Sequence, residues 1–466
     1  MRRAAAALLA VVVIASAMAA ESGAALPAPV AQALKSAYID ARNVAVIVRS
    51  VDGGTPVISH NPAQAMNPAS VMKLLTTYAA LEILGPSYTW TTEALVEAAP
   101  VDGLLAGNLT LRGSGDPKLG LEQFWLLLRE LRWRGVRDIG GDLVIDRSAF
   151  ALPPHDAAAF DQEPLRPYNA GPDALLVNFK AIRFVIAPDP ERRAVRVWQE
   201  SPDARLRIDN RLSLGNGDCG DWRELLTPRF DGLTLQLTGS FAATCGEKAL
   251  NLSPFAADVQ VDGLFRGLWG ELGGTLRGQV REGVAAAGAT VFVSRQSPAL
   301  AEIVRDTNKF SNNVMARQIL LGLAPERPAT PAAAERRVRQ WLTEKNLRMP
   351  ELVLENGAGL SRRERISADS LAALLAAAWA SPVMAEFVAS LPVSGSDGTL
   401  KKRLNGGPAS GRAHLKTGYL DSVRSLAGYV LDAHGKRWIV VALINDPNAR
   451  AGKPALDALV DGVAGR

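Results

Sequence analysis

Residues 67–86, NPASVMKLLTTYAALEILGP, predict a helix that carries a serine and a lysine in its first turn. Asn67 is a favourable N-cap, and Pro68 suits the first helical position, where no backbone N–H is needed. The Gly-Pro pair that closes the stretch predicts where the helix ends. Ser70 and Lys73 are three residues apart and are therefore expected on one face of the helix.

This pairing of a hydroxyl with an amine is suited to nucleophilic catalysis. The hydroxyl of Ser70 is expected near the positive end of the helix dipole, with the amine of Lys73 one turn away. Such a pair can activate a serine without a histidine. A Ser-x-x-Lys match is common by chance in a chain of 466 residues, so its meaning depends on the rest of the sequence.

Residues 1–20 have the pattern of a secretory signal peptide. Arg2 and Arg3 form a charged start, residues 8–14 are apolar, and residues 17–19 (AMA) resemble a cleavage site. The apolar run is too short to favour a membrane span, although a retained, uncleaved anchor stays open as the alternative. No cysteine follows the run, which argues against lipid modification. We therefore expect an exported, periplasmic protein that is soluble or loosely membrane-associated.

Length and composition allow a large folded protein. The 466 residues suffice for two or three domains, and 48% of them are hydrophobic, which provides a sizeable core. The net charge is +5, but lysine and arginine are scattered along the chain, so nucleic acid is not an expected partner. The four histidines form no H-E-x-x-H and no short-spaced pair, which argues against a zinc site.

The chain has two cysteines, Cys219 and Cys245. An exported protein with one pair of cysteines usually oxidises them. They flank a strand-like stretch at 233–237, so we predict a local disulfide that staples a small domain. Two separate buried thiols are the alternative.

The order of the elements indicates a catalytic region interrupted by an insertion. An apolar run at 44–48 predicts a buried strand, and residues 57–59 are its expected partner. Between about 90 and 290, short strand-like runs alternate with turns, and one helix is expected at 121–133. The elements expected after this β-rich stretch are helices at 299–310, from 314, at 331–345, at 368–379 and at 453–463, and strands at 352–354, 425–431 and 437–444.

Three short motifs stand in a fixed order in matching local contexts. The first opens a helix, the second lies between two helices, and the third precedes a β-hairpin. Together they are far more specific than any one of them. The motifs are Ser70-x-x-Lys73, Ser311-x-Asn313 and Lys416-Thr417-Gly418.

On these motifs, and on the long gap between the first and the second, the chain resembles the low-molecular-mass penicillin-binding proteins of the D-alanyl-D-alanine carboxypeptidase/endopeptidase type. The resemblance covers essentially the whole mature chain. It implies an α/β transpeptidase-like domain, with an antiparallel sheet flanked by helices, and a β-rich insertion of one or two small domains. Further stretches that resemble the family are 113–117 (GSGDP), 355–362 (ENGAGLSR) and 391–400 (LPVSGSDGTL).

The resemblance also implies how the domains divide. The catalytic domain is split by the insertion, and a third domain is nested within the second. The expected boundaries are 1–20 for the signal peptide, 27–90 and 290–466 for the catalytic domain, 91–165 and 256–289 for the inserted domain, and 166–255 for the nested domain.

The resemblance assigns catalytic roles to the motif residues. Ser70 is expected to attack the peptide carbonyl between two D-alanines, and Lys73 to take its proton. Burial and the second cation, Lys416, are expected to lower the pKa of Lys73. Ser311 would relay a proton to the departing amine; its alternative interpretation is an N-cap for the following helix.

The remaining motif residues are expected to bind substrate. Asn313 would form hydrogen bonds with the substrate amide and with Lys73. Lys416 and Thr417 would bind the terminal carboxylate of the substrate. Gly418 would leave room for substrate to add a strand to the sheet. The backbone N–H groups of Ser70 and Tyr419 are the expected oxyanion hole.

Two positions leave questions open. The family often has serine or threonine where this chain has Tyr419, and a tyrosine cannot place its hydroxyl at the same point. Asp161 falls where the family's insertion carries an acidic residue that reaches toward the free amine of the stem peptide. A surface aspartate before a turn is the alternative for Asp161.

We therefore expect a serine DD-peptidase that hydrolyses D-Ala-D-Ala ends or D-Ala-diaminopimelate cross-links of peptidoglycan. Its expected partners are stem peptides and, as covalent inhibitors, β-lactams; no metal or organic cofactor is implied, and a homodimer stays open. A serine β-lactamase is one alternative, against which the large insertion argues. A non-catalytic wall-binding protein of the same fold is another.

Overall fold

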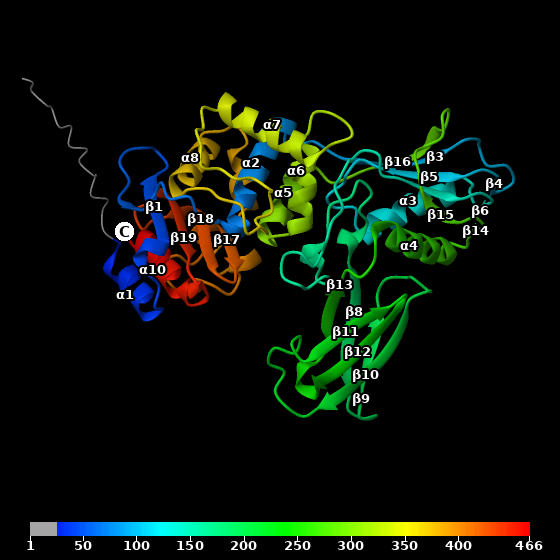
Figure 1. The fold of residues 1–466 in the computed structure, drawn as a ribbon, viewed down its shortest axis with the longest axis horizontal. Coiled ribbons are helices and arrows are strands. Elements are labelled where there is room, and N and C mark those ends of the chain that lie inside the picture. Colours follow the sequence, from blue (N-terminus) through cyan, green and yellow to red (C-terminus); the bar gives the residue numbers. More distant parts are fainter. Residues whose placement is uncertain (1–25) are drawn as a thin grey trace, which may run out of the picture.

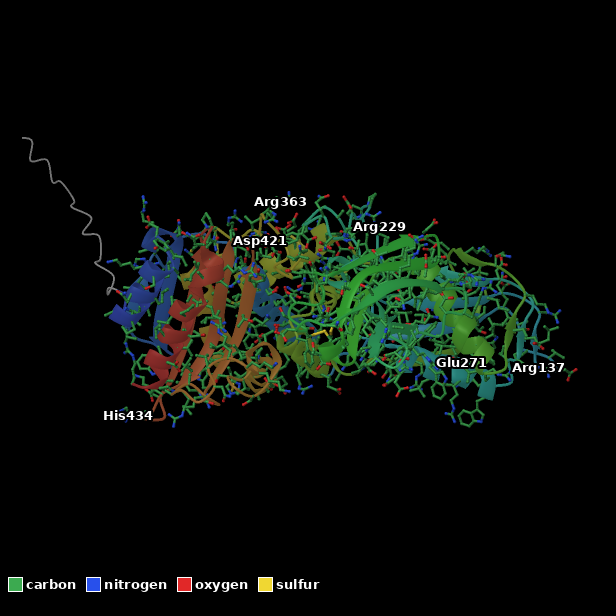
Figure 2. All side chains as sticks on the ribbon, turned by 90° about the horizontal axis from the view of Figure 1, so that it is seen from below. Arg137, Arg229, Glu271, Arg363, Asp421 and His434 are labelled. Atoms are coloured by element: carbon green, nitrogen blue, oxygen red, sulfur yellow. A yellow bond between two sulfur atoms is a disulfide. The ribbon has the colours of Figure 1, made fainter. Side chains whose placement is uncertain are left out.

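The computed structural model describes residues 26–466. The predicted signal peptide at 1–20 lies outside these residues. The molecule is elongated, with His434 near one end and Arg137 and Glu271 near the other (Figure 2). Within residues 26–466, the apolar stretches of the helices are too short to cross a membrane.

The first of two five-stranded sheets, called sheet 1, is built from the two ends of the described chain (Figure 1). Its order is β17-β18-β19-β1-β2, and every neighbouring pair is antiparallel. Its central strands are buried on both faces, which explains their continuous apolar runs. The predicted antiparallel sheet and C-terminal hairpin are confirmed. The strands are β1 Val44–Ser50, β2 Ile58–His60, β17 Ala413–Leu420, β18 Val423–Leu431 and β19 Arg437–Asn445.

Helices cover both faces of sheet 1. On one face a large apolar core surrounds α2, whose residues from Lys73 to Leu81 are all buried. On the other face α1 and α10 pack against each other and against the sheet. The helices are α1 Ala28–Ser36, α2 Lys73–Leu84, α5 Leu300–Lys309, α6 Asn313–Gly322, α7 Pro331–Glu344, α8 Ala368–Trp379, α9 Met384–Ser390 and α10 Lys453–Ala464.

The insertion begins with a second five-stranded sheet, sheet 2, ordered β15-β7-β5-β3-β16, which with a small sheet, β14-β6-β4, encloses a separate apolar core. Helices α3 and α4 pack on this core (Figure 1). The predicted helix at 121–133 is confirmed as α3. The elements are β3 Thr91–Val96, β4 Leu104–Leu105, β5 Leu109–Gly113, α3 Leu121–Trp133, β6 Asp138–Ile139, β7 Leu143–Asp146, α4 Ala257–Glu271, β14 Thr275–Leu276, β15 Val280–Glu282 and β16 Thr290–Gln296.

Strand β16 bears on the expected boundary at residue 290. The expected catalytic segment 290–466 includes residues 290–296, but these residues pair antiparallel with β3 in sheet 2. The backbone pairing of a strand, rather than its composition, decides to which sheet it belongs. We propose that the catalytic region resumes after Gln296, and otherwise keep the expected division as a proposal.

The nested part forms two three-stranded sheets, β10-β12-β11 and β13-β8-β9. Buried and exposed residues alternate along β12, so one face packs inward and the other faces solvent. Cys219 and Cys245 form the predicted disulfide, which joins the end of the β10 loop to the turn after β12. The strands are β8 Ile182–Asp189, β9 Ala194–Gln199, β10 Arg207–Gly215, β11 Leu226–Asp231, β12 Thr234–Ala242 and β13 Lys248–Leu252.

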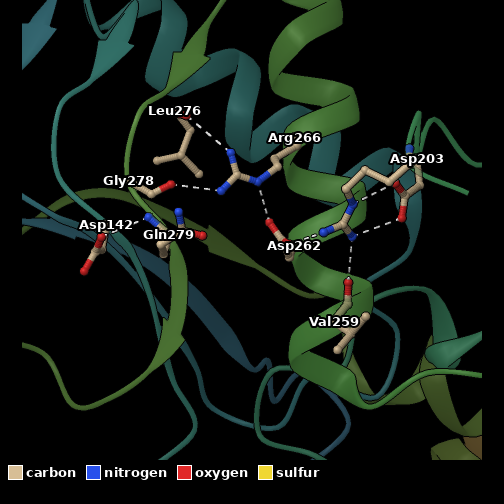
Figure 3. A network of polar contacts seen from close by, with 9 residues as sticks. Asp142, Asp203, Val259, Asp262, Arg266, Leu276, Gly278 and Gln279 are labelled. Carbon is tan, nitrogen blue, oxygen red and sulfur yellow. Dashed lines mark hydrogen bonds and ion pairs between the residues drawn. The ribbon is translucent and has the colours of Figure 1, made fainter. Parts of the chain in front are cut away.

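A polar network fastens the nested part to α4 (Figure 3). Asp262 on α4 accepts from two guanidinium groups, those of Arg205 and Arg266. Arg205 also donates to the carbonyl of Val259, at 3.1 Å, and to the carboxylate of Asp203, at 3.1 Å. The shared carboxylate therefore links the two parts of the insertion through one helix.

One local prediction was wrong. Residues 352–354 form no strand; Val353 makes only an isolated bridge with Arg365. After β16 the chain enters α5, whose N-cap is Ala299. The hydroxyl of Ser297 accepts the N–H of Trp90, at 3.0 Å, and so ties the end of β16 to the chain that enters sheet 2.

Candidate active site

Ser70 lies in a tight turn rather than in the first turn of an α-helix. Residues Ala69–Met72 form a 3-10 helix, and α2 begins only at Lys73. The predicted N-cap role of Asn67 is wrong, because Pro68 is the N-cap residue of this turn; the side chain of Asn67 accepts the N–H of Ala69, at 2.9 Å, just before it. Ala69 has a φ of +47°, a left-handed conformation that is costly for alanine. The strained residue directly precedes the serine, which is half-buried and reachable.

Lys73 is fully buried, and its amine has three oxygen acceptors. Nζ donates to Oγ of Ser70 at 2.9 Å, to Oδ1 of Asn313 at 2.6 Å, and to the carbonyl of Ala358. Burial lowers the pKa of Lys73 well below its usual range, and the nearby charge of Lys416 lowers it further. The amine is thus close enough to Ser70 to take its proton.

The turn between α5 and α6 forms a second side of the cleft, beside the turn that carries Ser70. Ser311 has a φ of +56°, and Asn312, not Ser311, is the N-cap of α6, accepting the N–H of Met315 at 3.1 Å. The alternative interpretation of Ser311 as a cap is therefore wrong. Its hydroxyl instead accepts from Nζ of Lys416 at 2.8 Å.

Strand β17 forms a third side of the cleft. Lys416 is fully buried, and burial lowers its pKa to about 7. Besides Ser311, its amine donates to the carbonyl of Thr417, at 2.8 Å. The Thr417 hydroxyl donates to that of Thr399, at 2.9 Å. Two hydroxyls and one ammonium group therefore gather at this end of the cleft.

Gly418 has a different structural reason from the one predicted. A Cβ at this position would collide with Oγ of Ser425 and lie 2.7 Å from the carbonyl of Pro68. The space beside Gly418 is thus filled by protein and not left for substrate. The absence of a side chain lets β17 pack directly on the turn that carries Ser70.

The outer edge of β17 directs backbone N–H groups away from β18. Leu415 donates its N–H at 2.9 Å to the carbonyl of Pro392, away from β18. Because alternate residues of a strand direct their N–H groups to the same edge, the N–H of Tyr419 also points away from β18. This direction fits the expected role of that N–H in an oxyanion hole.

The side chain of Tyr419 lies on the protein surface. It is 53% exposed, and the guanidinium of Arg424 stacks 3.5 Å from the centre of its ring. The ring is thus held on the surface by Arg424.

Asp161 organises a loop that reaches the cleft from the insertion. Its carboxylate accepts from the hydroxyl of Tyr168 at 2.9 Å, from Nδ2 of Asn169 at 2.7 Å, and from the N–H of Glu163 at 3.1 Å. The carbonyl of Tyr168 in turn lies 3.5 Å from Nδ2 of Asn313. The bond to Glu163 is typical of an aspartate before a turn, and the bonds to Tyr168 and Asn169 link that turn to the loop beside Asn313.

A cavity of about 1150 Å³ opens beside this loop. Most of the residues that line it come from the loop, α6 and the segment 355–363, and they include Phe160, Asn169, Arg317 and Leu360.

The sequence did not point to several residues that contact the motifs or lie buried near them. The carbonyl of Ala358 has no sequence signal, because any residue supplies a carbonyl. Thr399 lies in a stretch that resembles the family, yet nothing in its spacing points to Thr417. Glu364 is buried among three arginines in the sequence, and no pattern in the sequence pointed to it. Arg317 is likewise buried, donating to the carbonyl of Ala170 at 2.6 Å.

Comparison with known proteins gives a consistent result. A model of the D-Ala-D-Ala carboxypeptidase 3 (S13) family matches residues 26–464. A D-alanyl-D-alanine carboxypeptidase of Actinomadura sp. (strain R39) is 30% identical over 438 residues, covering 90% of this chain and 80% of that relative.

Solved structures of the same fold include proteins from two bacteria. Penicillin binding protein 4 (dacB) from Haemophilus influenzae has a TM-score of 0.76 at 22% identity, covering 93% of this chain and 99% of the other. A penicillin G acylated predatory endopeptidase from Bdellovibrio bacteriovorus, in complex with an immunity protein, has a TM-score of 0.53 at 14% identity, covering 91% and 94%. The predicted fold class is thereby confirmed.

Proposed function

Because this chain belongs to the D-Ala-D-Ala carboxypeptidase 3 (S13) family, we propose that it cleaves the bond between two D-alanines of peptidoglycan stem peptides through an acyl-enzyme on Ser70. The observation that carries the proposal is the 2.9 Å contact between Nζ of Lys73 and Oγ of Ser70. This contact joins a reachable hydroxyl to a buried amine whose pKa is lowered.

In the first step Oγ of Ser70 attacks the carbonyl carbon of the penultimate D-alanine, and its proton passes to Nζ of Lys73. The carbonyl oxygen becomes an oxyanion, which the N–H groups of Ser70 and Tyr419 stabilise. The bonds of Lys73 to Asn313 and Ala358 keep the amine from turning away from the serine.

In the second step the C–N bond breaks, and the departing D-alanine takes a proton on its amine. Ser311, whose hydroxyl is held by Lys416 at 2.8 Å, relays to this amine the proton that Lys73 took from Ser70, so Lys73 is neutral again and Lys416 keeps its proton. An acyl ester on Ser70 remains. Water then attacks the ester, with Lys73 again as the base, and releases the shortened peptide.

The terminal carboxylate of the substrate binds at the end of β17. Lys416 supplies positive charge, and the hydroxyls of Thr417 and Thr399 supply donors. The ring of Tyr419, held by Arg424, forms the outer rim. A β-lactam carries a carboxylate in a similar place and acylates Ser70 by the same attack.

Cross-linked peptides are proposed as further substrates. The loop held by Asp161 and the adjoining cavity of about 1150 Å³ provide room for the rest of a stem peptide. The penicillin G acylated endopeptidase from B. bacteriovorus, which shares the fold, supports both endopeptidase cleavage and acylation. The signal-like residues 1–20 support export to the periplasm, where these substrates are found.

The test is an assay of products from defined cross-linked and uncross-linked muropeptides. We expect the wild-type protein to release D-alanine from the latter and separated stems from the former. Ser70→Ala should abolish both activities while melting at the wild-type temperature. Activity that persists in Ser70→Ala would contradict the assignment of the nucleophile.

The lifetime of a penicillin adduct separates the proposal from its alternatives. A stable adduct supports a peptidase, whereas rapid turnover would indicate a β-lactamase. A protein that neither binds penicillin nor releases D-alanine would be a non-catalytic wall-binding protein.

A further inference from the structure

Glu364 is a buried acid that the proposed steps do not use. Its side chain has no exposed surface, and it follows the segment 355–361 that lies against Ser70 and Lys73. In the sequence its neighbours are Arg362 and Arg363, which are exposed, and Arg365, which is half-buried. A carboxylate is costly to bury, so its contacts deserve a physical explanation.

One oxygen of this carboxylate holds the start of the segment. Oε1 of Glu364 accepts the N–H of Glu355 at 3.1 Å, of Asn356 at 2.9 Å and of Gly357 at 3.0 Å. Three consecutive N–H groups that converge on one oxygen form an anion-binding nest. This carboxylate oxygen therefore fixes the backbone of the segment.

The fixed segment continues directly to the catalytic amine. The carbonyl of Ala358, the next residue, accepts from Nζ of Lys73, and the carbonyl of Gly357 accepts from Oγ1 of Thr76 at 2.7 Å. Both acceptors bind α2 on the face that carries Lys73. Glu364, the segment and the amine are thus linked by consecutive hydrogen bonds.

The charges around Lys73 come from three elements. Lys416 on β17 and Arg317 on α6 are cations that lower the pKa of Lys73, while Glu364 opposes them. Burial raises the pKa of Glu364, and the backbone N–H groups and the charge of Lys73 act in the other direction. Glu364 is thus the acid that acts on Lys73 against two cations.

The second carboxylate oxygen argues against a purely structural staple. Within residues 26–466, Oε2 of Glu364 is buried and has no hydrogen-bond partner. An amide or a backbone turn would hold the same three N–H groups without leaving a buried charged oxygen unpaired. What the carboxylate adds is its negative charge beside Lys73.

We propose that Glu364 is a positioning residue for Lys73. It holds the segment whose Ala358 carbonyl binds the amine, and its charge sets the pH range in which the amine accepts the proton of Ser70. The inference rests on the proposed acylation of Ser70. It predicts that the removal of the charge, with the shape retained, moves the acidic limb of the acylation rate.

The test is the pH profile of acylation by a fluorescent penicillin in the full-length protein. In Glu364→Gln the carbonyl oxygen can keep the three N–H bonds while the charge is lost. The lysine amine then loses its proton more easily, so the acidic limb should move to lower pH by about one unit. The matched control is Glu351→Gln, whose carboxylate accepts from the N–H of Ser367 at the start of α8; its profile should stay with the wild type.

A second variant separates charge from shape. Glu364→Asp keeps the charge but shortens the side chain, so its rate should fall while its acidic limb stays with the wild type. This comparison remains informative if Glu364→Gln does not fold, which a melting curve reports. The acidic limb of the pH profile should therefore stay in place in Glu364→Asp. If it moves to lower pH by about one unit, as expected for Glu364→Gln, the inference is overturned.

Two further outcomes are distinct. If the wild-type protein is acylated but Glu364→Gln loses rate equally at every pH, the residue is only a structural staple and the inference fails alone. If the wild-type protein is not acylated at any pH, the proposed function fails and the inference fails with it.

Discussion

The surroundings of Lys73 and Lys416 differ, although both amines are fully buried within one cleft. Nζ of Lys73 has a hydroxyl, an amide oxygen and a carbonyl as acceptors, and an acid, Glu364, lies near it. Nζ of Lys416 has one hydroxyl and one carbonyl, and burial alone lowers its pKa to about 7. The same side chain is thus placed in two different electrostatic environments.

The difference indicates how one residue type serves two roles. A base must give up its proton before the reaction and be aimed at the nucleophile, which requires acceptors that fix its direction. A carboxylate-binding cation must keep its proton while substrate is bound, and the substrate itself supplies the missing negative charge. The neighbours, rather than burial, therefore separate the roles of Lys73 and Lys416.

The largest effect is expected when residue 73 can no longer accept the proton of Ser70. Lys73→Arg keeps a positive charge, but a guanidinium cannot act as a base at ordinary pH. The rate of acylation by a fluorescent penicillin should fall by about 10³-fold.

Lys416→Arg is the matched control. This variant keeps the charge that the second lysine is proposed to supply, so it should lose far less activity than Lys73→Arg. Equal losses in the two arginine variants would show that the lysines do not have separate roles.

The pH dependence of substrate affinity tests the role of Lys416. With a pKa of about 7, Lys416 loses its charge as the pH rises above neutral, so affinity for a free carboxylate should fall. KM for a peptide that ends in D-Ala-D-Ala should rise by about tenfold per pH unit once Lys416 is neutral, because only the protonated fraction binds. The same peptide with its terminus esterified is the control and should show no such rise. A parallel rise for both peptides would contradict the role of Lys416.

A smaller effect is expected at Thr399. Thr399→Val keeps the shape but removes the hydroxyl that accepts from Thr417, at 2.9 Å. Loss of one such hydrogen bond costs about 1 kcal/mol, so KM should rise by about fivefold while kcat is nearly unchanged. Steady-state kinetics with D-Ala-D-Ala peptides measures this. A fall in kcat without a change in KM would place Thr399 elsewhere in the mechanism.

The sequence predicted the fold where local signals are strong. The apolar run at 44–48 and the hairpin near the C-terminus gave sheet 1, and the cysteine pair gave the disulfide. The pairing of β16 with β3 could not be predicted, because the two strands lie about 200 residues apart in the chain and pairing over such a distance leaves no local pattern.

The site was predictable for side chains and not for backbone groups or buried charges. The three motifs come together as the resemblance implied, and the structure joins them through the amines of Lys73 and Lys416. The carbonyl of Ala358 and the burial of Glu364 depend on how one loop folds against α2, which composition does not reveal. Gly418 was noticed, but its reason, contact with Pro68, required the packing of two distant segments.

The central claim is that Ser70 becomes acylated while Lys73 takes its proton, and mass spectrometry of penicillin-treated protein tests it most directly. We predict one stable adduct, located by peptide mapping on the fragment that contains Ser70, and no adduct in Ser70→Ala. An adduct on another residue, such as Ser311, or its absence from the folded wild-type protein, would contradict the claim.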